Sequence, residues 1–500
     1  MKIYQFLAKF EKKLVEMVGK KEKTPQLNMF QIPLKQFINE SHELVGLSKK
    51  IDWESIESDL SVYYCEDNGR PGVPIRLIVG IIMLRRMFNQ SDESVLDRWV
   101  ENPYWQYFCG EVYFRHDYPF DRTELIKFRQ RIGEKGAEQI LKATVNLFEK
   151  KEVQEKEVLI DTTVQEKNIT FPTDVKLQKK IIEQCRKISK SEGIRLRQTY
   201  KGELKQLMID QRFHDHPRRK KKALAARRRI KVIAGKVFRD LERKMTEDHR
   251  WKYKNKFSIF NRVLTQTRDS NNKIYSLHQP QVSCIAKGKE HKKYEFGNKV
   301  SIAKTRKSGI VIGVMSFAGN PFDGDTLSPQ LAQVERITGY KPETGIVDRG
   351  YRGRKQISGT QIICPGKSPG STSKYQRQKI RQRFRARAGI EPIIGHVKHD
   401  HRMLRNYLLD HIGDTMNSIL AAAGFNLRKM LRRLKSEAKL IFEVFENFIL
   451  MLSRNLILFI LRKNRGFSRL TNKTRRQLGQ RSQLVSVTIK LWQARRQYGQ

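Results

Sequence analysis

The stretch VLIDTTVQEKNITFPTD, residues 158 to 174, decides how this chain folds and raises a question of charge. Three aliphatic residues typical of a buried strand run directly into a carboxylate, Asp161, and no cationic residue stands beside it. Burying an unpaired charge costs several kcal/mol or shifts its pKa until the group is neutral. We therefore expect a counter-charge from elsewhere in the fold, and a metal ion is one candidate.

The charge balance of the whole chain indicates a polyanionic partner. One hundred Lys and Arg against 52 Asp and Glu leave a formal net charge of +48 at pH 7 over 500 residues. No folding requirement explains this excess. Basic residues recur from one end of the chain to the other, whereas basic membrane binders concentrate them in one amphipathic helix or cluster. Nucleic acid is therefore favoured over a membrane surface.

Cysteine usage and hydropathy exclude two other classes of protein. The five cysteines are far apart and form no CxxC pair, which is typical of free thiols in a reducing cytosol rather than of disulfides or a zinc site. The N-terminal 23 residues predict an amphipathic helix and no signal peptide. The apolar stretch 447–462 is interrupted by polar residues, so we expect a packed helix there and not a membrane span, which needs ~20 mostly apolar residues.

Strand and helix signals alternate in the central part of the chain. Short β-rich segments bounded by glycine recur at 293–303 and 309–319 after the opening strand. A helix, DTLSPQLAQVERITG, follows, and then come the strands TGIVD, ending at Asp348, and QIICPG, residues 361 to 366. This order predicts a mixed α/β sheet.

Two apolar strands end in a carboxylate, since EVLID ends at Asp161 and TGIVD ends at Asp348. Strands of one sheet that both present an acid at an end can bring those acids within a few ångströms of each other. A single strand-terminal Asp is usually a turn former or a helix cap. The pair is therefore more informative than either residue alone.

The basic region RFRARAGIEPIIGHVKHDHRM, residues 383 to 403, offers a third carboxylate in Glu391. Pro392 follows it, which fits the first turn of a helix, where a missing N–H costs nothing. Lys398 lies seven residues after Glu391, two turns along the same face. A carboxylate facing metal ions, with a cation in line with it, is expected where a phosphate lies between them.

Four motifs place these residues in a known family. DTTVQEKNITFPTD, NPFDGDTL, VDRGYRG and IEPIIGHVKHDHRMLRNYLLDHIGDTMNSILAAAGFNL closely resemble the DDE transposases of bacterial insertion sequences, specifically the insertion-sequence-five group. The resemblance runs from about residue 60 to about residue 435, with the motifs in the right order. It implies an RNase H-like catalytic core with a mixed sheet, preceded by an all-helical DNA-binding domain.

The resemblance also implies which residues form the site. The acidic triad would be Asp161, Asp348 and Glu391, and these three would share the metal. The related signature Y-x2-R-x3-E-x6-K aligns on Arg387, Glu391 and Lys398. Arg387 and Lys398 would position the scissile phosphate.

Two further positions of the family motifs bear on DNA. Phe384 stands where the signature has its tyrosine, so any hydrogen bond from that hydroxyl to a DNA phosphate is absent. Arg349, in VDRGYRG, is expected to contact DNA.

The chemistry that follows uses divalent cations. All-oxygen ligation suits Mg²⁺ or Mn²⁺, and two ions ~4 Å apart would activate the attacking oxygen and stabilise the leaving one. The nucleophile would be water when an element end is nicked and the freed 3′-hydroxyl when it joins target DNA. We expect no small-molecule cofactor. The partners would be double-stranded element ends and target DNA, with a homodimer or higher oligomer on DNA, in a prokaryotic cytoplasm at the nucleoid.

The chain divides into segments of different composition. We expect a helical extension over 1–39, a helical, helix-turn-helix-like domain over 40–150, the catalytic domain over 151–435 and a basic helical tail over 436–500. The catalytic domain carries a basic helical insertion at about 175–270, for which a solvated, partly disordered segment and a phosphate-backbone contact are both open.

One helix of the N-terminal region is a candidate for contact with DNA. FDRTELIKFRQRIG has a capping-box pattern in Asp121 and Glu124 and closes with Gly133. A basic face laid against DNA and a solvated basic face remain equal alternatives for this segment. The cations expected on its outward face are Arg122, Lys127, Arg129 and Arg131.

Other polar groups near the motifs have simpler explanations. No cysteine or second histidine cluster accompanies His396, His399 and His401, so zinc is not favoured. Asp323 and Asp325 in NPFDGDTL are explained by turn and helix-cap roles, and Asp174 by a cap of the helix that follows it.

The sequence therefore predicts a DNA transposase that cleaves and joins DNA by metal-dependent phosphodiester chemistry. The alternative is a degenerate or repurposed copy that only binds DNA, which the unmatched tail after about 436 motivates. A nuclease of the same fold stays open. So does a basic nucleic-acid-packaging or ribosome-associated protein, which would need no such arrangement of three acids.

Overall fold

The computed structural model describes residues 16–19, 31–65, 70–267, 269–286, 293–365 and 373–463. Most of the helix expected at the N-terminus, and the tail beyond 463, lie outside these ranges. The one described part of that N-terminal helix is a strand, β1 (Glu16–Gly19), which pairs in parallel with β2 (Arg70–Pro74). The helical expectation is therefore wrong there, because this backbone pairs with another segment.

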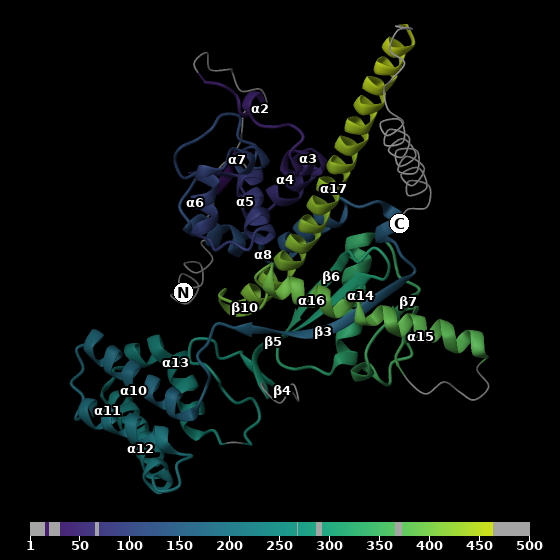
Figure 1. The fold of residues 1–500 in the computed structure, drawn as a ribbon. Coiled ribbons are helices and arrows are strands. Elements are labelled where there is room, and N and C mark those ends of the chain that lie inside the picture. Colours follow the sequence, from purple (N-terminus) through teal and green to yellow (C-terminus); the bar gives the residue numbers. More distant parts are fainter. Residues whose placement is uncertain are drawn as a thin grey trace.

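A mixed sheet lies at the centre of the molecule (Figure 1). Its middle strand, β3 (Glu157–Lys167), pairs antiparallel with β5 (Tyr294–Thr305) and parallel with β7 (Thr344–Ile346). β5 pairs antiparallel with β6 (Val311–Phe317), and β7 pairs parallel with β9 (Thr360–Ile363). The central order β6-β5-β3-β7-β9 confirms the predicted mixed α/β sheet. Three shorter strands extend it, namely β4 (Ser283–Ala286), β8 (Gln356–Ile357) and β10 (Arg405–Asn406).

The N-terminal region is helical, as predicted, and shares one hydrophobic core with the sheet. In α5 (Ile75–Met87) every residue except Arg76 is buried, which agrees with its apolar pattern. Its core continues through the sheet face and the start of the last helix. The remaining helices are α2 (Leu34–Phe37), α3 (Glu43–Lys50), α4 (Trp53–Ser61), α6 (Ser94–Glu101), α7 (Pro103–Phe108), α8 (Thr123–Val145) and α9 (Lys150–Val153). Gly133, with φ of 55°, breaks α8 where the sequence predicted an end.

The basic insertion is a folded helical unit of its own (Figure 1). It consists of α10 (Asp174–Ser191), α11 (Lys201–Asp210), a 3₁₀ turn (Gln211–Phe213), α12 (Lys220–Lys244) and α13 (Glu247–Thr265). These helices bury a separate apolar core that includes Ile182, Ile230 and Phe260. The interpretation as a partly disordered segment is therefore wrong for the described residues. Thr173, and not Asp174, caps α10 by accepting from Lys176 N.

Three further helices complete the fold. α14 (Leu327–Thr338) packs on β6, and α16 (Ile390–His399) packs on β3. α15 (Lys374–Ala388) lies beside β7.

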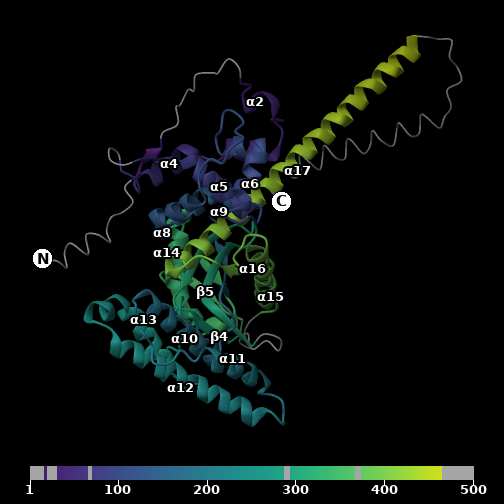
Figure 2. The same ribbon diagram turned by 90° about the vertical axis from the view of Figure 1, so that its left-hand side faces the viewer.

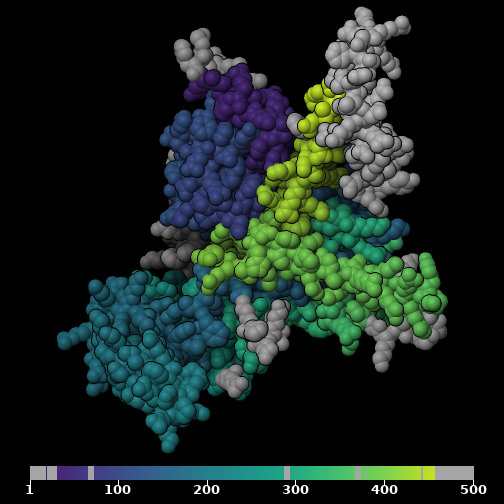
Figure 3. All heavy atoms as spheres, viewed as in Figure 1, coloured from purple at the N-terminus to yellow at the C-terminus, as the bar shows by residue number. Residues whose placement is uncertain are grey.

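The last helix, α17 (Asp410–Lys463), is 54 residues long and divides into two parts. Its first part is buried against α5, α8 and β6, whereas the second projects away from the body (Figures 2 and 3). We expected a packed helix at 447–462. The helix is present, but apolar side chains of its projecting part are exposed, namely Val444, Phe445, Phe448, Ile449, Leu450, Met451 and Leu452. No helix in the described part of the chain is long and apolar enough to span a membrane.

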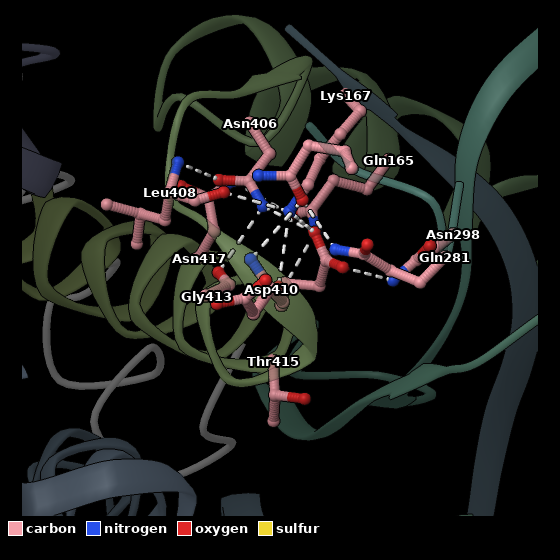
Figure 4. Close-up of polar contacts among 12 residues, drawn as sticks. Gln165, Lys167, Gln281, Asn298, Asn406, Leu408, Asp410, Gly413, Thr415 and Asn417 are labelled. Atoms are coloured by element: carbon pink, nitrogen blue, oxygen red, sulfur yellow. Dashed lines mark hydrogen bonds and ion pairs between the residues drawn. The ribbon is translucent and has the colours of Figure 1, made fainter. Parts of the chain in front are cut away.

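A buried polar network attaches the start of α17 to the end of β3 (Figure 4). Lys167 and Asp414 form an ion pair in which the side chains are 2% and 1% exposed. The Asp414 carboxylate also accepts from the amides of Asn298 and Asn406. Lys167 Nζ additionally donates to the Leu408 carbonyl at 2.8 Å. Both charges are thus surrounded by hydrogen-bonding partners.

The network continues into the N-terminal helices. Asn417 Nδ2 donates to Gln165 Oε1 at 2.8 Å, and Arg86 Nη2 of α5 donates to Asn417 Oδ1 at 2.9 Å. The network therefore connects β3, α17 and α5.

Candidate active site

Three carboxylates from separate segments meet on one face of the sheet, where β3 lies beside β7. β3 and β7 run parallel with Leu159 opposite Ile346. Asp161 and Asp348 each lie two residues further on, so they point to the same sheet face as this pair. Ile390 of α16 packs against both Leu159 and Ile346. Glu391 is the next residue, so this apolar contact carries a third carboxylate to the same place.

A guanidinium lies between these carboxylates. Arg387 Nη1 is 3.6 Å from Asp161 Oδ2 and 3.9 Å from Asp348 Oδ2, and Arg387 Nη2 is 3.1 Å from Glu391 Oε1. The side chains of Arg387 and Asp161 are each 18% exposed, whereas Asp348 and Glu391 are 48% and 64% exposed. The counter-charge expected for Asp161 is therefore supplied by this arginine, which faces three acids alone.

Asp161 is the most constrained of the three acids. Its Oδ1 accepts a hydrogen bond from Thr162 N at 2.8 Å. Burial raises the pKa of Asp161 to about 6; the Thr162 N–H and Arg387 lower it, and Asp348 and Asp323 raise it further. One arginine thus compensates only part of the cost of keeping this carboxylate ionised.

A fourth acid, Asp323, lies at the site and was not predicted there. Its Oδ1 accepts from Thr162 Oγ1 and from Lys299 Nζ, both at 2.9 Å. The assignment of Asp323 to a simple turn role is therefore incomplete, since it also braces the strand residue next to Asp161. Asp325 does not cap α14, whose N-cap is Thr326; it is exposed and pairs with Arg354 at 2.7 Å.

Tyr351, also missed from the sequence, is buried behind this group. Burial and the nearby charges of Asp161 and Asp323 raise the pKa of its hydroxyl well above the usual value. Tyr351 follows Asp348 by three residues in VDRGYRG, so the motif supplies both an acid and part of the wall behind it.

Phe384 explains how α15 is fixed beneath the site. It packs against Leu159, Ile346 and Ile390. One residue earlier, Arg383 Nε donates to Glu157 Oε1 at 2.8 Å, which attaches α15 to the start of β3. The signature tyrosine position is thus occupied by a packing residue.

Other predicted residues lie near the triad but outside it. Arg349 is exposed, and its N–H donates to Asp348 Oδ1 at 2.6 Å. Lys398 is half-buried, two turns along α16 from Glu391.

Two of the three histidines that follow Glu391 have partners within the protein. His396 contacts Asp400 at 2.7 Å. His401 is buried, with Nδ1 2.9 Å from the Arg86 carbonyl, and burial lowers its pKa to about 4.

The basic face expected on α8 is wrong in part. Arg129 is buried and makes a bidentate pair with Asp92, with distances of 3.0 and 2.7 Å. Asp92 also contacts Arg85 at 2.5 Å, and these cations lower its pKa to about 2. Arg129 lies in the apolar stripe of the helix and therefore points inward.

The other cations of that face also make contacts within the protein. Arg131 stacks over the Tyr64 ring at 4.6 Å, and Lys127 pairs with Glu124 at 2.5 Å. Arg122 is exposed and pairs with Glu93. The helix presents no continuous row of solvent-facing cations.

The acids at the site fit a metal ion in their chemistry but not in their present arrangement. Among the described residues, no group of three His, Cys, Asp or Glu side chains lies close enough to hold a metal ion as it stands. The carboxylates of Asp161, Asp348 and Glu391 nevertheless already surround one cation within 4 Å. Hard oxygen donors in excess of cationic charge fit Mg²⁺ or Mn²⁺ if Arg387 turns away.

The fold and site together define a mixed α/β protein with three acids gathered around one arginine on its sheet. Residues 32–131 match the family model described as Transposase domain (DUF772). An uncharacterized protein, ORF8 in the nfe locus of Rhizobium meliloti, is 37% identical over 195 residues, which are 38% of this chain and 94% of that protein. No solved structure matches the chain. The N-terminal region of the chain therefore carries a transposase-family domain.

Proposed function

We propose that this protein is a DDE-type DNA transposase that binds the terminal inverted repeats of an insertion sequence, cleaves its ends and joins them to target DNA. The observation that carries this proposal is the convergence of Asp161, Asp348 and Glu391 on Arg387. The transposase-family domain supports the transposase role. The strand order β6-β5-β3-β7-β9, with only the last three strands parallel, supports the RNase H-like core.

The three carboxylates would hold Mg²⁺ or Mn²⁺ in this proposal. When bound, two such ions supply a Lewis acid at the attacking oxygen and another at the leaving oxygen. The chain contributes the ligands on two rigid strands and one helix, a placement that favours precise geometry.

Arg387 has two successive roles in this scheme. In the metal-free protein it offsets the mutual repulsion of three carboxylates. Once they are neutralised by other cations, its planar guanidinium is available to a phosphate, which it can bind through two parallel hydrogen bonds. Lys398 and Arg349 would contact the DNA backbone on either side of the scissile phosphate.

The proposal also covers the reaction steps, the oligomeric state and the place of action. The nucleophile is water in end cleavage and the freed 3′-hydroxyl in strand transfer, and neither step requires a covalent enzyme intermediate. Holding two element ends together requires a dimer or higher oligomer on DNA. The site of action is the nucleoid of a prokaryotic cell.

The test is cleavage of labelled duplex carrying the DNA that flanks the gene, with Mg²⁺ or with EDTA. Asp348→Asn should abolish metal-dependent cutting at the element boundary. Asp325→Asn is the matched control, because this exposed acid pairs with Arg354 outside the triad. It should cut like the unmodified protein.

A second candidate function is DNA binding without catalysis. Phe384 favours it, because the residue at the signature tyrosine position has no hydroxyl. Tight DNA binding by the unmodified protein, with no cutting under Mg²⁺ or Mn²⁺, would establish this candidate and overturn the first.

A further inference from the structure

The insertion carries far more positive charge than its fold uses. Residues 174–277 contain 31 Lys and Arg against 11 Asp and Glu, a net charge of +20. The cations are densest along α12, which packs one face on the insertion core through residues such as Ile230, Val237 and Leu241. The opposite face is open to solvent.

The cations of α12 fall into two groups. Those on one flank are neutralised inside the insertion, since Lys222 pairs with Asp210 at 3.1 Å, Arg229 with Glu203 at 2.6 Å and Arg243 with Asp240 at 3.1 Å. The exposed cations of α12 that have no ion-pair partner among the described residues are Lys220, Lys221, Arg228, Lys231, Lys236 and Arg239.

Three of the unpaired cations form a row along the helix. At 100° per residue, Lys221, Arg228 and Arg239 fall within about 20° of one another around the axis. Lys220 and Lys231 lie about 80–100° around the axis from this line, on one flank of the helix. The cationic stretch from Lys220 to Arg239 is about 29 Å long at 1.5 Å per residue.

A hollow of about 470 Å³ lies against this row. Its lining includes Arg227, Arg228 and Lys231, together with Lys273, which pairs with Asp174 of the same lining at 3.4 Å. The Nε of Arg227 is buried and has no hydrogen-bond partner. A buried donor left unsatisfied costs about 1–3 kcal/mol, which an anionic acceptor in the hollow would remove.

The position of the row relative to the triad suggests which DNA it meets. Asp161 and Lys167 are six residues apart on β3, about 20 Å at the strand rise. The insertion begins beyond Lys167, at the end of β3 away from α15 (Figure 1). At about 3.4 Å per base pair, the row therefore lies at least about six base pairs from a phosphate at the triad.

We propose that the outward face of α12, the cationic stretch Lys220–Arg239, binds the phosphate backbone of duplex DNA flanking the cleavage point. This inference rests on the proposed function for the identity of the polyanion as DNA. Contacts from Lys and Arg to phosphate oxygens position the DNA and carry no sequence information. The contact is therefore independent of sequence and dependent on salt.

The test compares two triple variants of the full-length protein that change the charge equally. Lys221→Gln, Arg228→Gln and Arg239→Gln remove unpaired cations, whereas the control Lys222→Gln, Arg229→Gln and Arg243→Gln removes paired ones. Affinity for a flanking-end duplex is measured in EDTA over a range of salt concentrations. We expect the first variant to bind roughly ten- to a hundredfold more weakly at low salt, with a log–log salt slope reduced by about two to three.

The control should keep both its affinity and its salt slope close to those of the unmodified protein. Equal losses in both variants would show a general charge effect and overturn the proposal, and so would no loss in either. Circular dichroism and thermal melting verify that both variants fold. A larger loss on an A-form RNA duplex than on DNA would assign the face to RNA instead.

Hydroxyl-radical footprinting locates the contact. The first variant should lose protection at least about six base pairs from the element boundary and keep protection at the boundary itself. Loss at the boundary alone would contradict the placement. These measurements use no metal, so they test the α12 contact even if the protein does not cleave DNA. A protein that binds no DNA at all would refute both the α12 contact and the proposed function.

Discussion

Strand β3 carries two charge clusters, six residues apart, that differ in how fully their charges are compensated. At Lys167 one ammonium faces one carboxylate, Asp414, and amides and carbonyls occupy the remaining positions around both. At Asp161 one guanidinium faces three carboxylates, two of them about half exposed or more. The first cluster is balanced and closed, whereas the second is acidic in excess and open.

This difference separates a structural cluster from a functional one. A buried pair whose partners are all present resists change, because removing either partner leaves an uncompensated charge. A cluster with surplus carboxylates is costly for the fold and is kept where a further cation has a use. The perturbed Asp161, with its pKa raised to about 6, belongs to the second kind.

The largest effect should come from breaking the balanced cluster. Lys167→Met leaves Asp414 buried without its cation, so we expect unfolding to become easier by about 3–5 kcal/mol. Urea denaturation monitored by fluorescence measures this. The double change Lys167→Met with Asp414→Leu should recover most of the loss, because it removes both charges. A double variant as unstable as the single one would show that packing, and not the charge balance, stabilises the attachment of α17 to β3.

The excess of acid predicts an opposite effect at Asp161. Its folded-state pKa lies above the unfolded value of 3.8, so the folded protein binds this proton more tightly and loses stability as pH rises from about 4 through 6. In EDTA at pH 7, Asp161→Asn should therefore be more stable than the unmodified protein, by up to about 3 kcal/mol. At pH 4 the difference should vanish. If Asp161→Asn is less stable than the unmodified protein at pH 7, the ionised Asp161 carboxylate does not destabilise the fold, and the interpretation of the cluster as acidic in excess is wrong.

Arg387 sharpens the comparison because it contacts the three carboxylates to which our proposal assigns divalent cations. In Arg387→Gln we expect Mn²⁺ to bind about five- to thirtyfold more tightly, since no arginine competes for the carboxylates, while DNA cleavage falls. Calorimetric titration without DNA measures the affinity. Arg383→Gln, four residues earlier on α15 and paired with Glu157, is the control and should leave Mn²⁺ affinity unchanged. Weaker Mn²⁺ binding in Arg387→Gln would mean that the arginine organises the ligands.

The smallest effect is expected at Phe384, beneath the open cluster. Phe384→Tyr adds a hydroxyl to a side chain packed on Leu159 and Ile346, so thermal stability should change by less than about 1 kcal/mol. Because this ring lies in the apolar cluster, cleavage should not increase. Faster cutting by the tyrosine variant would contradict this expectation and would indicate that a hydroxyl at this position contacts a DNA phosphate.

The sequence predicted the mixed sheet and the meeting of Asp161 with Asp348, because short apolar runs precede both acids and parallel pairing places them side by side. Its prediction that Asp161 ends a strand is wrong, because β3 continues to Lys167 and pairs there with β5 and β10, which no local pattern indicates. The role of Asp323 could not be predicted in this way, because Thr162 and Lys299 reach it from strands distant in sequence.

The inward direction of Arg129 was within reach of the sequence. Leu125, Phe128 and Ile132 are buried at helical spacing, and Arg129 falls inside their stripe. Its partner Asp92 lies 37 residues earlier, so only the fold could show what neutralises it. The position of Arg387 among three acids likewise depends on packing through Ile390, which no spacing reveals.

The insertion is, in topological terms, a hairpin turn. The chain leaves the sheet at Lys167, re-enters it through the short strand β4 and then forms β5, the antiparallel neighbour of β3, with Glu166 opposite Gly297. Two such strands need only a turn of about two to five residues. Each doubling of loop length costs only about 0.6 kcal/mol in closure entropy. The connection between β3 and β5 is thus a permissive insertion site. A domain inserted there can change in length or identity without shifting the strand register that positions Asp161.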